Sequence, residues 1–124
     1  MSVILGVAAG GALGALSRYG VDTWIERRSD AVFPWATFLI NVSGCLAVGF
    51  LIAALVDRHR APQWLRTALV LGFCGGYTTF STFAQEALDL LETDKAAVAL
   101  AAIAANVLLG LAAVFVGLRL GRLV

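Results

Sequence analysis

The sequence predicts an all-α integral membrane protein of four transmembrane helices, with the third helix broken at its middle. Hydrophobic residues make up 60% of the 124 residues and charged residues only 14%. A soluble domain carries about 25% charged residues. Four apolar segments, each close to the length that a bilayer requires, occupy nearly the whole chain. We therefore expect a single transmembrane domain, residues 1–124, surrounded by lipid.

Composition and motifs argue against an enzyme. A net charge of +1 gives no reason to expect a nucleic-acid partner. Cys45 and Cys74 both fall in apolar segments, where packing is a more ordinary role than a disulfide or a metal site. The sequence has no metal-binding cluster, no base beside a nucleophile and no phosphate-binding loop followed by lysine. His59, in a short polar loop, is expected to be solvated.

The first apolar segment spans about residues 2–21. No basic region precedes it, so we interpret it as a retained helix rather than a cleaved signal peptide. Arg18 lies near one end of this segment or inside it. Gly6, Gly10 and Gly14 repeat every four residues and form a flat stripe on one helix face, which allows another helix to approach closely.

The second segment spans about residues 35–56 and follows Pro34, a residue that suits the start of a helix. Its one strongly polar interior residue is Asn41, flanked by Thr37 and Ser43. A single amide inside the bilayer usually faces another helix or a polar path rather than lipid.

The third segment spans about residues 65–91 and contains the sequence GFCGGYTTFSTF at 72–83. Gly75 and Gly76 are adjacent, and glycine loses the most backbone entropy in a helix. Hydroxyl side chains compete with the helical hydrogen bonds, and four of them follow: Thr78, Thr79, Ser81 and Thr82. We expect a break here, of the kind that holds ions in other membrane proteins. On composition alone, the alternative is a polar helix that packs through its small residues.

The end of the third segment and the fourth segment carry the remaining polar residues. Glu86 and Asp89 share a helix face, which either emerges into water or lines an aqueous vestibule. The fourth segment, about residues 96–118, has Asn106 as its only strongly polar member. Arg119 and Arg122 then close the chain at the interface.

Basic residues are nearly balanced between the two ends of the predicted bundle. One end carries Arg58, Arg60, Arg66, Arg119 and Arg122, and the other carries Arg18, Arg27, Arg28 and Lys95. The positive-inside rule needs a clear excess on one side to fix the orientation. We therefore expect insertion in both orientations and an antiparallel homodimer.

The polar residues at membrane depth include no acid, which disfavours a cation or proton path. They are Thr37, Asn41, Ser43, Thr78, Thr79, Ser81, Thr82 and Asn106. Their hydroxyl and amide donors suit a small anion. Phe80 and Phe83 share a helix face, and the positive edges of two phenylalanine rings can attract an anion. The alternative is that both rings pack into lipid or a core.

The stretch 72–83 resembles the signature of the CrcB/Fluc family of fluoride channels. The resemblance extends to GGALGALSRY at 10–19 and ATFLINVSG at 36–44, and thus to essentially the whole chain. It implies an antiparallel homodimer in the cell (inner or plasma) membrane, with two fluoride pores and a sodium ion buried at the dimer interface.

The resemblance also implies roles for individual residues. Phe80 and Phe83 match the phenylalanines whose edges line the pores, and Asn41 matches an asparagine on the same path. Thr79, Ser81 and Thr82 match hydroxyls at the break, and Thr37 joins them as a polar residue of the path. Gly75 and Thr78 match the positions whose backbone carbonyls hold the sodium ion. Arg18 matches the arginine of the first helix, and Glu86 matches a carboxylate near the pore vestibule. Three positions depart from the family pattern or align loosely with it: Ala36, Tyr77 and Asn106.

A passive fluoride-selective channel that relieves fluoride toxicity is therefore the predicted function. Two alternatives remain open at the level of sequence. A small proton-coupled multidrug exporter would need a carboxylate deep in the first segment, and residues 1–17 have none. A non-conducting accessory subunit would pack through its small residues and form a hetero-complex.

Overall fold

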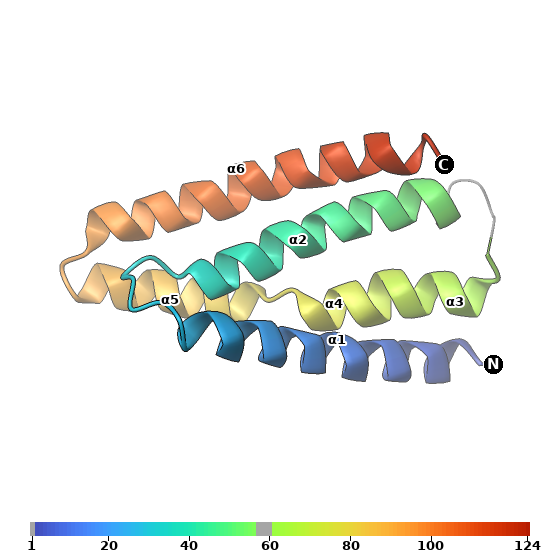
Figure 1. The fold of residues 1–124 in the computed structure, drawn as a ribbon, viewed down its shortest axis with the longest axis horizontal. Coiled ribbons are helices and arrows are strands. Elements are labelled where there is room, and N and C mark those ends of the chain that lie inside the picture. The colour runs from blue at the N-terminus through green and yellow to red at the C-terminus, as the bar shows by residue number, and fades with distance from the viewer. Residues whose placement is uncertain (1, 57–60) are drawn as a thin grey trace.

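The computed structural model describes residues 2–56 and 61–124, and this part of the chain contains helices and no strand. α1 (Val3–Glu26) is followed by α2 (Trp35–Leu51), which continues as the π-helix η1 (Ile52–Val56). The next rod is divided into α3 (Gln63–Thr67), the π-helix η2 (Ala68–Cys74), α4 (Gly75–Tyr77) and α5 (Phe80–Glu92). α6 (Ala96–Gly121) completes the fold. Both termini lie at one end of the bundle, opposite the 27–34 loop (Figure 1).

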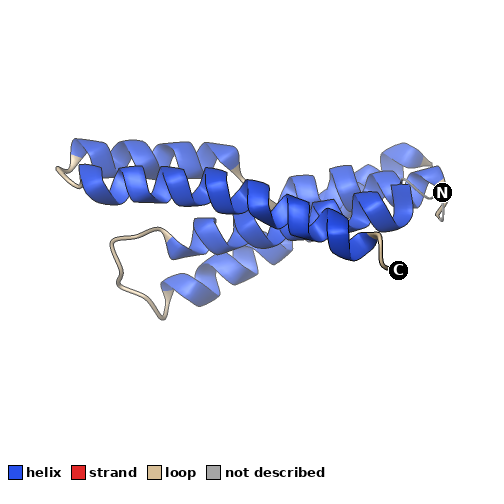
Figure 2. Cartoon of the chain, turned by 90° about the horizontal axis from the view of Figure 1, so that it is seen from above, coloured by secondary structure: helices blue, strands red, loops and turns tan. Residues whose placement is uncertain are grey.

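Among the described residues, three helices are long and apolar enough to cross a bilayer: Val3–Glu26, Trp35–Val56 and Ala96–Gly121. The described residues are thus all-helical, as expected, and consistent with a multi-pass membrane protein. The segment from Gln63 to Glu92 differs from these three because extended residues divide it. Seen from above, the helix pairs spread apart toward the end that carries the 27–34 loop and the 93–95 turn (Figure 2).

The glycine stripe of α1 packs against the divided rod of the same chain. A Cβ on Gly10 would overlap the carbonyl oxygen of Ala68, and a Cβ on Gly14 would overlap that of Phe73. Gly6 is buried in the same way, with its Cβ position 3.0 Å from the carbonyl oxygen of Trp64. The stripe therefore allows two backbones to come together, as small residues do in membrane bundles.

A second set of glycines brings α2 and α6 together. Cβ atoms on Gly49, Gly117 and Gly121 would each overlap a backbone oxygen of the opposite helix, those of Val114, Leu46 and Phe50 respectively. Each of these two helices therefore supplies glycines that admit the backbone of the other. Gly117 and Gly121 are four residues apart, the same spacing as in the first helix, although they were not singled out from the sequence.

α1 extends beyond the end expected near residue 21. Its last turn is held by the Arg27 N–H, which donates to carbonyls of α1, and by Arg28, whose guanidinium donates to the Trp24 carbonyl at 3.1 Å. The same guanidinium lies 4.5 Å from the centroid of the Trp24 ring. An apolar run marks the membrane-buried part of a helix, and the helix itself continues while its carbonyls find donors. The loop residues Arg58, His59 and Arg60 lie outside the described part of the chain.

Candidate functional site

The candidate site is built around two extended residues between α4 and α5. Thr78 has φ −78° and ψ 159°, and Thr79 has φ −147° and ψ 119°. The Thr79 hydroxyl accepts from the Thr82 N–H at 3.2 Å, so Thr79 is the N-cap of α5. A capping threonine satisfies a donor that the first turn of a helix leaves free. The interruption therefore begins a new helix with its own cap.

The adjacent glycines do not form the interruption, contrary to the reason for which they were singled out. Gly75 and Gly76 are both helical. A Cβ on Gly76 would lie 2.6 Å from the Gly11 carbonyl oxygen, so this glycine serves the close packing of α4 on α1. The threonines that follow are the residues in extended conformation. A threonine hydroxyl can form hydrogen bonds with backbone groups in place of the helical ones, whereas glycine has no side chain that could do so.

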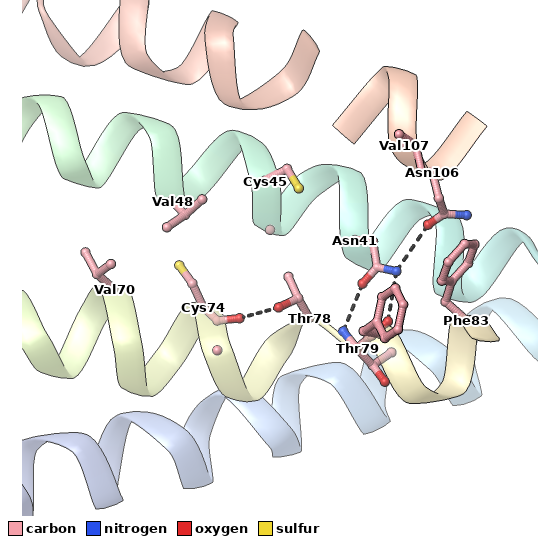
Figure 3. A pocket seen from close by; sticks show the side chains of 13 residues that line it. Asn41, Cys45, Val48, Val70, Cys74, Thr78, Thr79, Phe83, Asn106 and Val107 are labelled. Atoms are coloured by element: carbon pink, nitrogen blue, oxygen red, sulfur yellow. Dashed lines mark hydrogen bonds between the residues drawn. The ribbon is translucent and has the colours of Figure 1, made fainter. Parts of the chain in front are cut away.

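Asn41 binds the extended backbone of Thr79 at both of its polar groups. Its Nδ2 donates to the Thr79 carbonyl at 3.0 Å, and its Oδ1 accepts from the Thr79 N–H at 2.9 Å. The same Nδ2 donates to Oδ1 of Asn106 at 3.1 Å, and the Nδ2 of Asn106 donates to the Ala102 carbonyl at 3.0 Å. A continuous chain of hydrogen bonds thus joins α2, the interruption and α6 (Figure 3).

The interruption also removes the helical donors from two carbonyl groups. In a continuous helix, Thr79 N–H would donate to the Gly75 carbonyl and Thr82 N–H to the Thr78 carbonyl. Here the Thr79 N–H donates to Asn41 and the Thr82 N–H to the Thr79 hydroxyl. Gly75 and Thr78 are the two residues that the family resemblance implies for sodium, and both line the cavity described next. Within residues 2–56 and 61–124, no group of three or more His, Cys, Asp and Glu side chains could hold a metal.

A cavity of about 400 Å³ brings together seven of the residues singled out from the sequence. They are Asn41, Gly75, Thr78, Thr79, Phe80, Phe83 and Asn106. The ring centroids of Phe80 and Phe83 are 5.7 Å apart, with the planes inclined at 56°. Phe80 is 78% exposed, so most of its ring has no neighbour within this chain.

A second cavity of about 190 Å³ lies on the other side of the interruption. Arg18, Thr37, Thr79 and Thr82 line it, together with Asp22 and other residues of α1 and α2. Thr79 lines both cavities, and it is therefore the residue that separates them. Nearby, the Thr37 hydroxyl donates to Oε1 of Glu86 at 2.9 Å, which places the carboxylate of α5 against α2.

Ser81 and Glu86 are the two sequence-predicted site residues that line neither cavity. Of the two, only Glu86 is hydrogen-bonded, within the described part of the chain, to a residue that does line one, Thr37. Ser81 is exposed on the surface of α5. It follows Phe80 by one position, and neighbouring residues of a helix point in different directions.

Several cavity residues were not expected from the sequence. Cys45 and Cys74 line the larger cavity with Val48, Val70 and Val107, and ordinary apolar residues carry no pattern that would mark them. Tyr77 finds its hydroxyl partner in Ser43, with the two oxygens 3.0 Å apart. A buried tyrosine hydroxyl usually has a hydrogen-bond partner, but the sequence alone does not say which helix supplies it.

Comparisons with known proteins show to which family the chain belongs. The family described as CrcB-like protein, Camphor Resistance (CrcB), matches residues 5–118. The chain is 47% identical to the fluoride-specific ion channel FluC of Nitratidesulfovibrio vulgaris over 123 residues, which cover 98% of this chain and 97% of that protein. It is 44% identical to the protein of the same name from Rhizobium meliloti over 122 residues, 98% of each chain. It is 40% identical to that of Chloroflexus aurantiacus over 122 residues, 98% and 97% of the two chains. The chain therefore belongs to the CrcB-like protein family.

Proposed function

We propose that this protein is a passive, fluoride-selective ion channel, not an enzyme, and that it exports fluoride from the cytoplasm. The observation that carries the proposal is the constellation at the interruption. Amide, hydroxyl and phenylalanine side chains meet there without a carboxylate in the larger cavity. Relatives that cover nearly the whole chain are named fluoride-specific ion channels. The carboxylate of Glu86 lies instead beside the smaller cavity, bonded to Thr37.

The driving force needs no coupled reaction. In acidic surroundings fluoride is present in part as its neutral weak acid, which crosses the bilayer. The acid then ionises in the near-neutral cytoplasm and leaves the fluoride anion inside. A membrane potential that is negative inside then expels the anion, with about 2.3 kcal/mol per charge for each 100 mV. A selective pore has only to replace the hydration shell with several weak donors in a narrow space.

Phe80, Phe83 and Asn41 form the proposed path together with the hydroxyls of Thr37, Thr79 and Thr82 and with Asn106, whereas Ser81 lies outside both cavities. The inclined rings of Phe80 and Phe83 are consistent with edge-directed attraction of an anion. Thr79 separates the larger cavity, which has the phenylalanines, from the smaller one, which has the hydroxyl groups of Thr37 and Thr82, so on the proposed path an anion passes Thr79. Arg18 lines the smaller cavity together with Asp22, and Glu86 stands beside it at the proposed vestibule.

The functional unit that we propose is an antiparallel homodimer of four-span subunits with a broken third span, in the cell (inner or plasma) membrane. The 78% exposure of Phe80 supports it, since an exposed pore ring needs a second wall. A structural sodium ion would lie between the subunits, held by the carbonyl groups of Gly75 and Thr78. The support for this is that the interruption has taken away the helical donors of both groups.

The test is fluoride efflux from liposomes that contain the purified protein. An ionophore clamps the voltage, and external electrodes record fluoride and chloride. We expect rapid release of fluoride with no release of chloride and no dependence on a proton gradient. Release that requires a proton gradient would favour an exporter. A folded protein that releases no fluoride, and that is extracted in a stable hetero-complex, would favour an accessory subunit.

A further inference from the structure

The orientation of the Asn41 amide is dictated by the backbone of Thr79. An N–H group can only donate and a carbonyl can only accept. The Asn41 oxygen must therefore face the Thr79 N–H, and the Asn41 nitrogen must face the Thr79 carbonyl. No other orientation of this amide satisfies both groups, although oxygen and nitrogen are otherwise similar in shape.

Asn41 then dictates the orientation of Asn106. The second hydrogen on Nδ2 of Asn41 needs an acceptor, so Asn106 must present its oxygen, at 3.1 Å. Both amide hydrogens of Asn41 are thereby used inside the protein, one by Thr79 and one by Asn106. A side-chain NH₂ group has only two hydrogens. Asn41 therefore has none to offer to an anion while these bonds persist.

Asn106 is left with one amide hydrogen. Its Nδ2 donates the other to the Ala102 carbonyl within α6. The other hydrogen on Nδ2 of Asn106 forms no hydrogen bond with any of the described residues. Asn106 lines the larger cavity together with Phe83, and in Figure 3 its nitrogen points away from Asn41.

We propose that Asn106 supplies the side-chain amide hydrogen that binds the permeating anion, and that Asn41 is a positioning residue that holds Thr79 extended and orients Asn106. This inference rests on the proposed fluoride pathway, and it divides two roles that the sequence could not separate. An anion beside Phe83 meets a ring edge from α5 and one N–H from α6. Recruiting Asn41 instead would leave a buried carbonyl or amide without its partner, which is costly at membrane depth.

The chain offers a direct experiment because Asn41 and Asn106 are its only asparagines. Selective ¹⁵N-asparagine labelling of the wild-type protein in detergent micelles or nanodiscs gives two side-chain amide pairs in the NMR spectrum. The Asn106→Asp variant identifies them, since it removes one pair and keeps an oxygen that accepts from Asn41. Under titration with sodium fluoride at constant sodium, we expect one proton of the Asn106 pair to shift and saturate. The Asn41 pair should remain in place.

Hydrogen exchange tests the positioning role separately. The Thr79 amide proton should exchange at least tenfold faster in Asn41→Ala than in the wild type, and should be unchanged in Asn106→Asp. Fluoride efflux should fall at least tenfold in Asn106→Asp, with its melting temperature retained. A saturating shift at the Asn41 pair, no shift at the Asn106 pair, or unchanged Thr79 exchange in Asn41→Ala would each overturn the assignment.

Wild-type efflux separates this inference from the proposed function. If the wild-type protein releases no fluoride from liposomes, the proposed function fails, and the inference falls with it. If it conducts and the Asn41 pair alone responds to fluoride, the function stands and only the division of roles is wrong.

Discussion

Thr79 carries more of the site than any other single residue. Its hydroxyl caps α5, its backbone pairs with Asn41, and it lines both cavities. A substitution that keeps the hydroxyl should therefore differ from one that removes it. The two β-substituents of threonine make this separation possible, because serine retains the oxygen and loses only the methyl group.

We expect Thr79→Ala to lower the free energy of unfolding by about 1 kcal/mol, since the helix loses its N-cap. Thr79→Ser should recover most of that loss. Thermal unfolding of the two variants in the same detergent measures both effects. Equal losses in the two variants would show that the methyl group, and not the cap, matters at this position.

Phe83 contributes a ring edge that an aliphatic side chain cannot imitate. Phe83→Ile and Phe80→Ile keep an apolar side chain and remove the aromatic quadrupole, so each should abolish fluoride efflux from liposomes. Phe38 is a matched control, because it is buried away from both cavities against Phe33 and Trp35. Phe38→Ile should conduct. Efflux that survives in Phe83→Ile would remove the ring edge from the mechanism.

The sequence predicts which residues are polar at depth but not which atoms they bind. That Asn41 and Asn106 lie in the membrane follows from the apolar runs around them. That they bond to each other at 3.1 Å, 65 positions apart, depends on the rotation and height of α2 against α6. Those depend on the contacts of Gly49, Gly117 and Gly121, and the spacing of glycines within one helix does not say which helix they meet or at what height.

At the scale of helices, α1 is held to the divided rod by backbone contact rather than by large side chains. A leucine at Gly10 would have to displace the backbone of η2, because the carbonyl of Ala68 already occupies the position of a Cβ. Overpacking of this kind costs about 1–3 kcal/mol, and more where backbone must move. Gly20, on the same helix, has nothing within 4 Å of its Cβ position.

We therefore expect Gly10→Leu to reduce the yield of monodisperse protein sharply and to lower its melting temperature. Gly20→Leu should behave like the wild type. Size-exclusion chromatography and thermal unfolding of the two variants compare them directly. Similar behaviour of both would mean that α1 tolerates displacement from the rod.

The divided rod also marks the limit of prediction by propensity. Its interruption was expected near the two glycines, and the structure has extended residues just after them, at Thr78 and Thr79. The π-helix Ala68–Cys74 was not predicted at all. Both results have one cause, since backbone geometry here is set by packing against α1 and by the Asn41 bonds. Local helix preference is too weak to oppose such contacts.

At the scale of the whole molecule, the proposed sodium ion joins two copies through carbonyl groups. Replacement of sodium by a large organic cation should then shift the proposed homodimer toward monomers and lower fluoride efflux together. Chemical cross-linking and efflux, measured across a series of sodium concentrations, would follow both quantities. A dimer that persists without sodium, with full efflux, would assign the carbonyls of Gly75 and Thr78 another role.

The near balance of basic residues leads to a prediction about orientation. The 27–34 loop and the 93–95 turn lie at one end, and both termini lie at the other (Figure 1). Asp30→Lys with Asp94→Lys adds positive charge to the first end, and Ser2→Lys with Leu123→Lys adds it to the second. All four positions lie outside the helices Val3–Glu26, Trp35–Val56 and Ala96–Gly121. By the positive-inside rule, each double variant should insert in one orientation only, and the two orientations should be opposite.

An antiparallel dimer cannot form from one orientation, so each variant alone should fail to restore growth in fluoride, while co-expression of both should restore it. Single-cysteine labelling at Lys95, from each side of the cell, would verify the orientations. Full growth with either variant alone, once its single orientation is verified, would refute the antiparallel arrangement and leave a parallel dimer or a monomer as the conducting unit.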